Sequence, residues 1–99
     1  MKRLLVVALV LTLGLSVAGL AAGKVAVVLD VGGRGDLAFN DMGFKGTDQA
    51  AKDFGLQMVE VQCATGADYL PNMRNLARTG EYDLIICVGF LLGDALAAA

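Results

Sequence analysis

The chain has 99 residues, of which 57% are hydrophobic and 18% charged, with 8 Lys and Arg against 10 Asp and Glu. This hydrophobicity excludes an intrinsically disordered chain, and the lack of a basic excess argues against a nucleic-acid-binding protein. The chain has no His and 2 Cys, too few ligands for a tetrahedral zinc site and no base for a His-dependent nucleophile. We therefore expect a single small domain with no metal and no other cofactor.

The hydrophobic residues are concentrated at the N-terminus. A basic start is followed by an apolar run over 4–20, which ends in the small residues Ala21-Ala22-Gly23. This pattern predicts a secretory signal peptide over 1–23. A cut before Gly23 and a cut before Lys24 both fit the pattern. The run approaches the ~18 residues of a membrane span, so an uncleaved membrane anchor is the alternative.

The rest of the chain, 24–99, alternates predicted strands and helices. Continuous apolar runs rich in Val and Ile are typical of parallel strands that are covered on both faces. Asn40 or Asp41 is the expected cap of the first helix, and Gly55 and Gly80 are typical helix ends. The elements are strands over 24–30, 56–62 and 82–88, and helices over 39–54, 69–79 and 91–99.

The order βαβαβα with short connections predicts an α/β fold, in which a parallel sheet lies between two helical layers. Three strands leave the sheet edges uncovered, so we expect residues 24–99 to be the N-terminal part of a larger, incomplete lobe. Cys63 and Cys87 are expected to stay unpaired, because Cys87 lies in an apolar run and is predicted to be a small buried side chain.

Candidate binding residues follow the predicted strands, because ligands of open α/β sheets bind outside the carboxyl ends of the strands. Asp30 ends the first strand, where a carboxylate has no packing value. Phe39 offers a face for stacking on a flat ligand, and Asn40 an amide that both donates and accepts. The alternatives are that Asp30 caps local amides and that Phe39 fills the core.

A glycine pattern in the first loop offers an enzyme hypothesis. Gly33-x-Gly35-x-x-Ala38 matches a relaxed dinucleotide fingerprint between a strand and a helix. Asp36 lies inside that loop and would repel a pyrophosphate. Gln62 and Cys63 stand where the ribose-binding acid is expected. An NAD-dependent enzyme is therefore the weaker hypothesis, and we predict that the chain is not an enzyme.

Several motifs resemble those of the basic membrane protein family, the substrate-binding lipoproteins of ABC transporters. The run Val31-Gly-Gly-Arg-Gly-Asp-Leu-Ala-Phe-Asn-Asp41, preceded by Asp30, resembles the family's opening signature. Ala67-Asp68-Tyr69 with Pro71 resembles its second-helix entry. The segments Tyr82–Ile86 and Val88–Phe90 resemble its third strand and the following turn.

The resemblance implies a type I periplasmic-binding-protein fold, in which two lobes close on the ligand and a membrane permease recognises the closed form. It implies a small-molecule ligand, most specifically a purine nucleoside, and no nucleic-acid partner. Carried over residue by residue, the stacking aromatic is Phe39, the polar contacts are Asp30 and Asn40, and Gly89 and Phe90 lie at the edge of the cleft.

The leader departs from the family pattern. Leu20-Ala21-Ala22 is followed by Gly23 where a lipoprotein has Cys, so the lipid attachment expected of the family lacks its acceptor. We therefore expect a periplasmic or secreted protein released by signal cleavage. A membrane-anchored sensor built on the same binding fold is the alternative.

Overall fold

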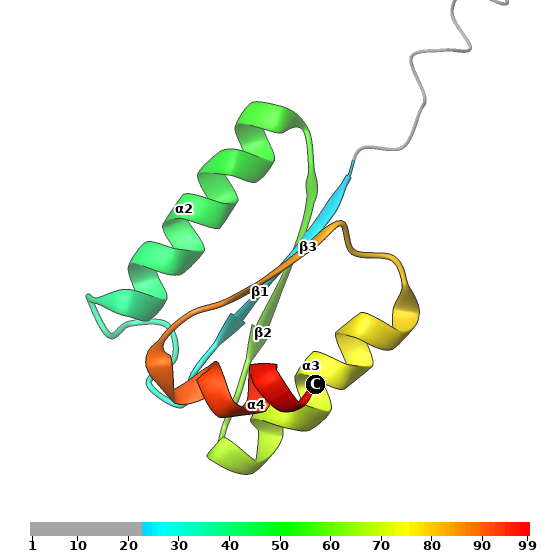
Figure 1. The fold of residues 1–99 in the computed structure, drawn as a ribbon. Helices are drawn as coiled ribbons and strands as arrows, with labels where there is room; N and C mark the ends of the chain where they lie inside the picture. The colour runs from blue at the N-terminus through cyan, green and yellow to red at the C-terminus, as the bar shows by residue number, and fades with distance from the viewer. Residues whose placement is uncertain (1–22) are drawn as a thin grey trace, which may run out of the picture.

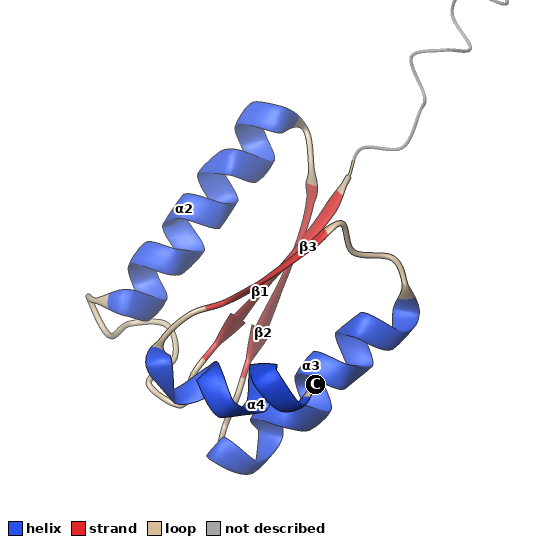
Figure 2. Ribbon diagram, viewed as in Figure 1, coloured by secondary structure: helices blue, strands red, loops and turns tan. Residues whose placement is uncertain are grey.

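The computed structural model describes residues 23–99. Three strands form one parallel sheet in the order β2-β1-β3: β1 (Lys24–Leu29), β2 (Gln57–Gln62) and β3 (Leu84–Cys87). Helix α2 (Phe39–Phe54) lies on one side of the sheet, and α3 (Tyr69–Thr79) and α4 (Gly93–Ala98) lie on the other (Figures 1 and 2). The predicted α/β architecture with three parallel strands is confirmed.

The central strand is buried on both faces. Five consecutive residues of β1, Val25–Leu29, are at most 5% exposed, which explains why this run shows no apolar-polar alternation. Ala26 and Val28 belong to the cluster that α3 and the segment after β3 complete, while Val25 lines a cavity between the sheet and α2. The main cluster consists of Ala26, Val28, Cys63, Tyr69, Met73, Leu76 and Leu92.

The first two helices have the bounds that the sequence predicts, α2 over Phe39–Phe54 and α3 over Tyr69–Thr79. Gly55 and Gly80 end α2 and α3 with φ of 65° and 64°, the left-handed conformation that favours glycine. The third predicted helix is split, because a 3₁₀ turn over Phe90–Leu92 precedes the short α4. A second 3₁₀ turn, Gly66–Asp68, leads into α3.

The two cysteines are free, as predicted, but their burial differs from the prediction. Cys63 is buried and Cys87 is only half-buried. The main-chain nitrogen of Cys63 bonds to Leu29 on one side of β1, and Cys87 pairs with Val28 on the other. Two strand spacings, roughly 9–10 Å, therefore separate them. A disulfide needs Cα atoms within ~7 Å, so these cysteines cannot pair without moving the backbone.

Helix α2 approaches the sheet closely at a glycine. A Cβ atom at Gly43 would lie 2.5 Å from Cγ2 of Val88, the residue after β3, whereas a Cβ at Gly46 would have nothing within 4 Å. A side chain at position 43 would therefore collide with Val88, whereas a side chain at position 46 would meet open space.

This difference predicts opposite effects of the same substitution on one helix. Gly43→Ala should lower the free energy of unfolding by ~1–3 kcal/mol, because the new methyl group overpacks against Val88. Gly46→Ala should raise it by ~0.5–1 kcal/mol, because alanine favours the helix. Urea unfolding of both variants measures the difference. Equal effects would contradict the close approach of α2.

Candidate ligand-binding edge of the sheet

Asp30 follows β1 and is half-buried at the carboxyl edge of the sheet. Its Oδ1 accepts hydrogen bonds from the Gly32 main-chain nitrogen at 2.8 Å and from Nδ2 of Asn40 at 2.7 Å. Its Oδ2 accepts none from residues 23–99. A Cβ at Gly89 would lie 3.0 Å from that Oδ2. Asp30 therefore caps a local amide with one oxygen and keeps the other available beside the turn that follows β3.

Asn40 is the buried partner of Asp30. Its side chain, in a residue that is 2% exposed, accepts a hydrogen bond from the Asp30 main-chain nitrogen at 3.1 Å. Its Nδ2 donates to Asp30, as described above, and to Oδ2 of Asp36 at 3.1 Å. Both amide hydrogens are thus used inside the protein, and a buried amide with satisfied donors fixes its neighbours. Asn40 joins the end of β1 to the start of α2.

Asp36 caps the first turn of α2, where Asn40 or Asp41 was expected. Its Oδ1 accepts from the nitrogens of Ala38 and Asp41 at 2.9 and 3.1 Å, and its Oδ2 accepts from the nitrogen of Asn40 at 3.0 Å. The bonds from Ala38 and Asn40 favour the ionised form most and lower the pKa of Asp36 to about 2. The expected caps were wrong because the loop folds back over the helix start.

Asp41 binds the main chain of the same loop instead of the helix amides. Its carboxylate accepts from the main-chain nitrogens of Gly35 and Leu37 at 2.8 and 2.9 Å. Arg34 reaches Asp41 at 3.5 Å and Glu60 at 3.3 Å, and its guanidinium lies 3.4 Å from the centre of the Phe44 ring. These contacts hold the glycine-rich loop against α2 and β2.

Each of the two segments that contact the Asp30 carboxylate carries an exposed aromatic side chain. Phe39 begins α2 directly before Asn40, and Phe90 directly follows Gly89. Phe39 is 74% exposed and Phe90 88%, so Phe39 does not fill the core. Gly89 has φ of 100°, which favours glycine. Exposed apolar residues continue around this edge: Val31, Leu37 and Leu91.

The last residue of β2 and the first residue of α3 contact the loop that follows β1. A Cβ at Gly33 would overlap the amide group of Gln62, which ends β2. The hydroxyl of Tyr69, in α3, accepts a hydrogen bond from the nitrogen of Val31 at 3.2 Å. Asp36 and Tyr69 were not among the predicted site residues. The spacing of Asp36 from Ala38, typical of an Asx turn, was a signal that could have found the first.

The amides at the start of α2 are already bonded to a carboxylate, which argues against the dinucleotide hypothesis. A pyrophosphate bound at this fingerprint would accept hydrogen bonds from free amides at the N-terminus of the helix. In α2 those amides are bonded to the Asp36 carboxylate. The loop therefore carries its own anion in the place where a dinucleotide would put its phosphates.

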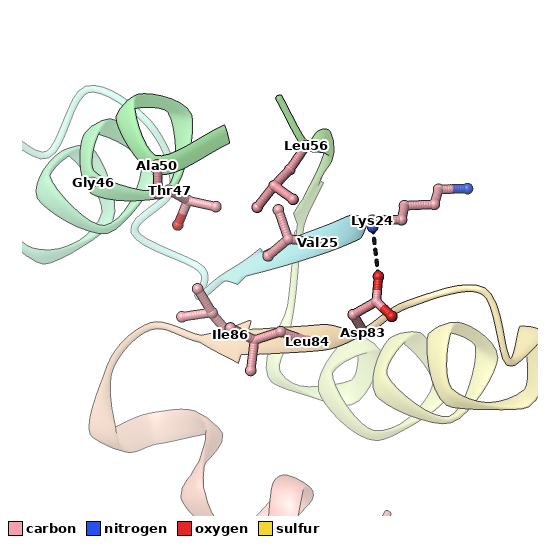
Figure 3. Close-up of a pocket in the computed structure, with 9 residues that line it drawn as sticks. All are labelled: Lys24, Val25, Gly46, Thr47, Ala50, Leu56, Asp83, Leu84 and Ile86. Atoms are coloured by element: carbon pink, nitrogen blue, oxygen red, sulfur yellow. Dashed lines mark hydrogen bonds between the residues drawn. The ribbon is translucent and has the colours of Figure 1, made fainter. Parts of the chain in front are cut away.

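A cavity lies at the opposite edge of the sheet, near the amino ends of β1 and β3. This cavity, of about 180 Å³, is lined almost wholly by apolar atoms between α2 and the sheet (Figure 3). Lys24 and Asp83 are at its rim.

Within residues 23–99, no group of three or more Cys, Asp and Glu side chains is placed to hold a metal ion, and no helix is long and apolar enough to cross a membrane.

The parallel sheet with helices on both sides, and with a carboxylate and exposed aromatics at its carboxyl edge, is one part of an α/β lobe. Comparison with known proteins gives the family. Residues 23–99 match the model of the Bmp family, described as ABC transporter substrate-binding protein PnrA-like. The chain belongs to this family.

Similar proteins support the assignment. An uncharacterized lipoprotein of Pyrococcus furiosus is 46% identical over 68 residues, which cover 69% of this chain and 17% of the relative. A CD4+ T-cell-stimulating antigen of Listeria monocytogenes is 34% identical over 77 residues, 73% of this chain and 21% of the relative. The crystal structure of an ABC transporter system solute-binding protein from Aeropyrum pernix K1 matches with a TM-score of 0.69 and 44% identity, over 75% of this chain and 20% of that one. The chain thus spans about a fifth of the length of these proteins.

The capping role of Asp36 predicts an acid-sensitive step in stability. Because the folded pKa is lowered to about 2 from ~3.9 in the unfolded chain, the stabilisation is complete above pH ~4 and is lost as the pH falls toward 2. Asp36→Asn should unfold at lower urea concentration at pH 7, and its unfolding midpoint should fall less between pH 4 and 2.

Urea titrations from pH 2 to 7 measure both effects. Asp53→Asn is the control, because the Asp53 carboxylate accepts only an exposed side-chain bond from Gln49 within the described residues. It should keep the wild-type acid dependence. Identical behaviour of the two variants would contradict the capping role of Asp36.

Proposed function

We propose that this chain supplies part of the first lobe of an extracytoplasmic solute-binding protein of an ABC importer, and that its ligand is a nucleoside of the purine type. One observation carries the proposal: the Asp30 carboxylate contacts two segments, through Asn40 and beside Gly89, and each segment carries an exposed aromatic side chain, Phe39 or Phe90. Such a group suits a ligand with a flat apolar ring and polar donors. The family name, PnrA-like substrate-binding protein, agrees with a small-molecule ligand.

The residues have distinct roles in this proposal. The base stacks on Phe39, and Oδ2 of Asp30 accepts a hydrogen bond from a ribose hydroxyl or a ring N–H. Asn40 positions Asp30, since both of its amide hydrogens are already donated. Gly89 brings the turn after β3 close to Asp30, and Phe90 lies at the rim of the cleft.

The contacts that this lobe offers supply only part of the binding free energy that a micromolar ligand needs. Stacking of a base on an aromatic ring contributes ~1–3 kcal/mol, and a hydrogen bond to a charged carboxylate ~1.5–3 kcal/mol. Micromolar affinity needs about 8 kcal/mol. A second lobe that closes over the exposed aromatics would supply the remainder, and the closed form would be the one that the membrane permease recognises.

The charge of Asp30 also selects among ligands. Asp30, Asp36 and Asp41 gather around the first loop, so a phosphate group would meet like charges. A nucleoside is therefore expected to bind more tightly than its nucleotide.

The location follows from the predicted leader. Residues 1–22 lie outside the described residues, and the proposal is that residues 1–23 direct export and are removed. The similar proteins of Pyrococcus are lipoproteins, whereas Gly23 stands in this chain where a lipid-carrying Cys would be needed. The protein would act in the periplasm or outside the cell without that lipid.

The stacking role predicts a position-specific loss of affinity. In the protein purified from its own host, Phe39→Ala should weaken adenosine or guanosine binding by tenfold or more, measured by isothermal titration calorimetry. Phe54→Ala is the matched control, because Phe54 is as exposed (76%) but lies at the other end of α2. It should bind as the wild type does.

Native mass spectrometry of the same protein tests the ligand directly. A retained mass equal to a nucleoside supports the proposal, while a retained sugar or amino acid would overturn the ligand class. Equal affinities of the Phe39→Ala variant and the wild type would contradict the stacking role.

A further inference from the structure

Lys24 is tied to the segment before β3 through three of its groups. Its main-chain nitrogen donates to Oδ2 of Asp83 at 2.8 Å (Figure 3), and its carbonyl oxygen accepts from the Asp83 nitrogen at 2.9 Å. Its Nζ forms an ion pair with Glu81 at 2.8 Å and lies 4.9 Å from the centre of the Tyr82 ring. The first residue of the central strand is therefore held by two acidic side chains.

The residues before Lys24 distinguish between the two cuts that the leader pattern left open. Signal peptidases require small side chains at the first and third positions before the cut. For the bond between Gly23 and Lys24, these positions are Gly23 and Ala21. For the bond between Ala22 and Gly23, the third position is Leu20, which is too large.

We propose that the leader is removed between Gly23 and Lys24, and that Asp83 is the acceptor for the α-ammonium group that this cut creates. The proposal rests on the export step of the proposed function. Water, with a membrane leader peptidase as catalyst, adds across the peptide bond. The C–N bond breaks, Gly23 leaves as a carboxylate, and the Lys24 nitrogen becomes an ammonium group. The nitrogen that already donates to Asp83 thus gains a positive charge.

The charges around Lys24 favour the chain that results from the cut. Before the cut, the Lys24 side chain is one cation beside two carboxylates, Glu81 and Asp83. After the cut, two ammonium groups face two carboxylates. Tyr82 is the other titratable group that faces Lys24 from this segment, and the start of β2 contributes the non-titrating Leu56 and Gln57.

The cut has a small structural cost. The carbonyl of Gly23 accepts a hydrogen bond from the nitrogen of Gln57 at 2.9 Å, and this donor at the open end of β2 returns to water. Gly23 itself lies against the acceptor, because a Cβ there would be 2.9 Å from Oδ2 of Asp83. Removing residue 23 frees space around the carboxylate for the new ammonium group and its hydration.

The position of the cut is measured by expressing the complete coding sequence in an export-competent host. Intact mass and N-terminal sequencing of the exported protein should give a chain that begins at Lys24. A chain that begins at any other residue, or that keeps the leader, would overturn the proposal.

The ion pair is measured on the same exported protein. An α-ammonium group beside a carboxylate has a raised pKa, so its stabilisation is full below pH ~8 and is lost as the pH rises through the folded value. The thermal midpoint of the wild type should therefore fall by a few degrees between pH 7.5 and 9.5. Asp83→Asn should start lower and remain flat over this range.

Glu81→Gln is the matched control, because it removes the neighbouring ion pair with the lysine side chain, which titrates at higher pH. It should keep the fall between pH 7.5 and 9.5. Parallel curves for the wild type and Asp83→Asn would overturn the ion pair. Nucleoside binding, measured separately on each sample, shows whether the proposed function holds independently of the N-terminus.

Discussion

The buried amide of Asn40 is the interaction on which the rest of the site depends. It bonds to the main chain and side chain of Asp30 at the end of β1, and to Asp36 at the start of α2. Leaving the buried Asn40 amide without its partners would cost ~1–3 kcal/mol, so strand, loop and helix keep one arrangement. The orientation of the Asp30 carboxylate, and with it the oxygen available to a ligand, is therefore set by the packing of α2.

The sequence was sufficient to predict the order of elements, because β1 and β3 are nearly continuous apolar runs and each long helix ends at a glycine. The strand ends were placed less well: the third run was expected over 82–88, whereas β3 covers Leu84–Cys87. Side-chain pattern does not show where ladder hydrogen bonds stop. The cap of α2 was missed for a similar reason, since Asp36 can reach the helix amides only after the loop has folded back.

The candidate site was predictable as a place, and less so in its detail. Parallel strands bring their carboxyl ends to one edge, and this rule predicts from the sequence that the segments holding Asp30, Asn40 and Gly89 lie together. The sequence could not show that Asn40 is buried while the adjacent Phe39 is exposed, because consecutive residues in the first turn of a helix face different directions. Burial thus suits Asn40 to position Asp30, and exposure suits Phe39 to contact a ligand.

The polar residues at the two ends of β1 fix its register in the sheet, which its apolar middle does not fix. Val25–Leu29 is buried on both faces, so a shift by one residue would exchange one apolar side chain for another, and the alternation of apolar and polar residues that usually fixes register is missing. The polar ends oppose it strongly. A shift would separate Asp30 from Asn40 at one end and Lys24 from Asp83 at the other. The register that places the carboxylate at the ligand edge is therefore fixed by hydrogen bonds at both ends of a strand whose interior scarcely specifies it.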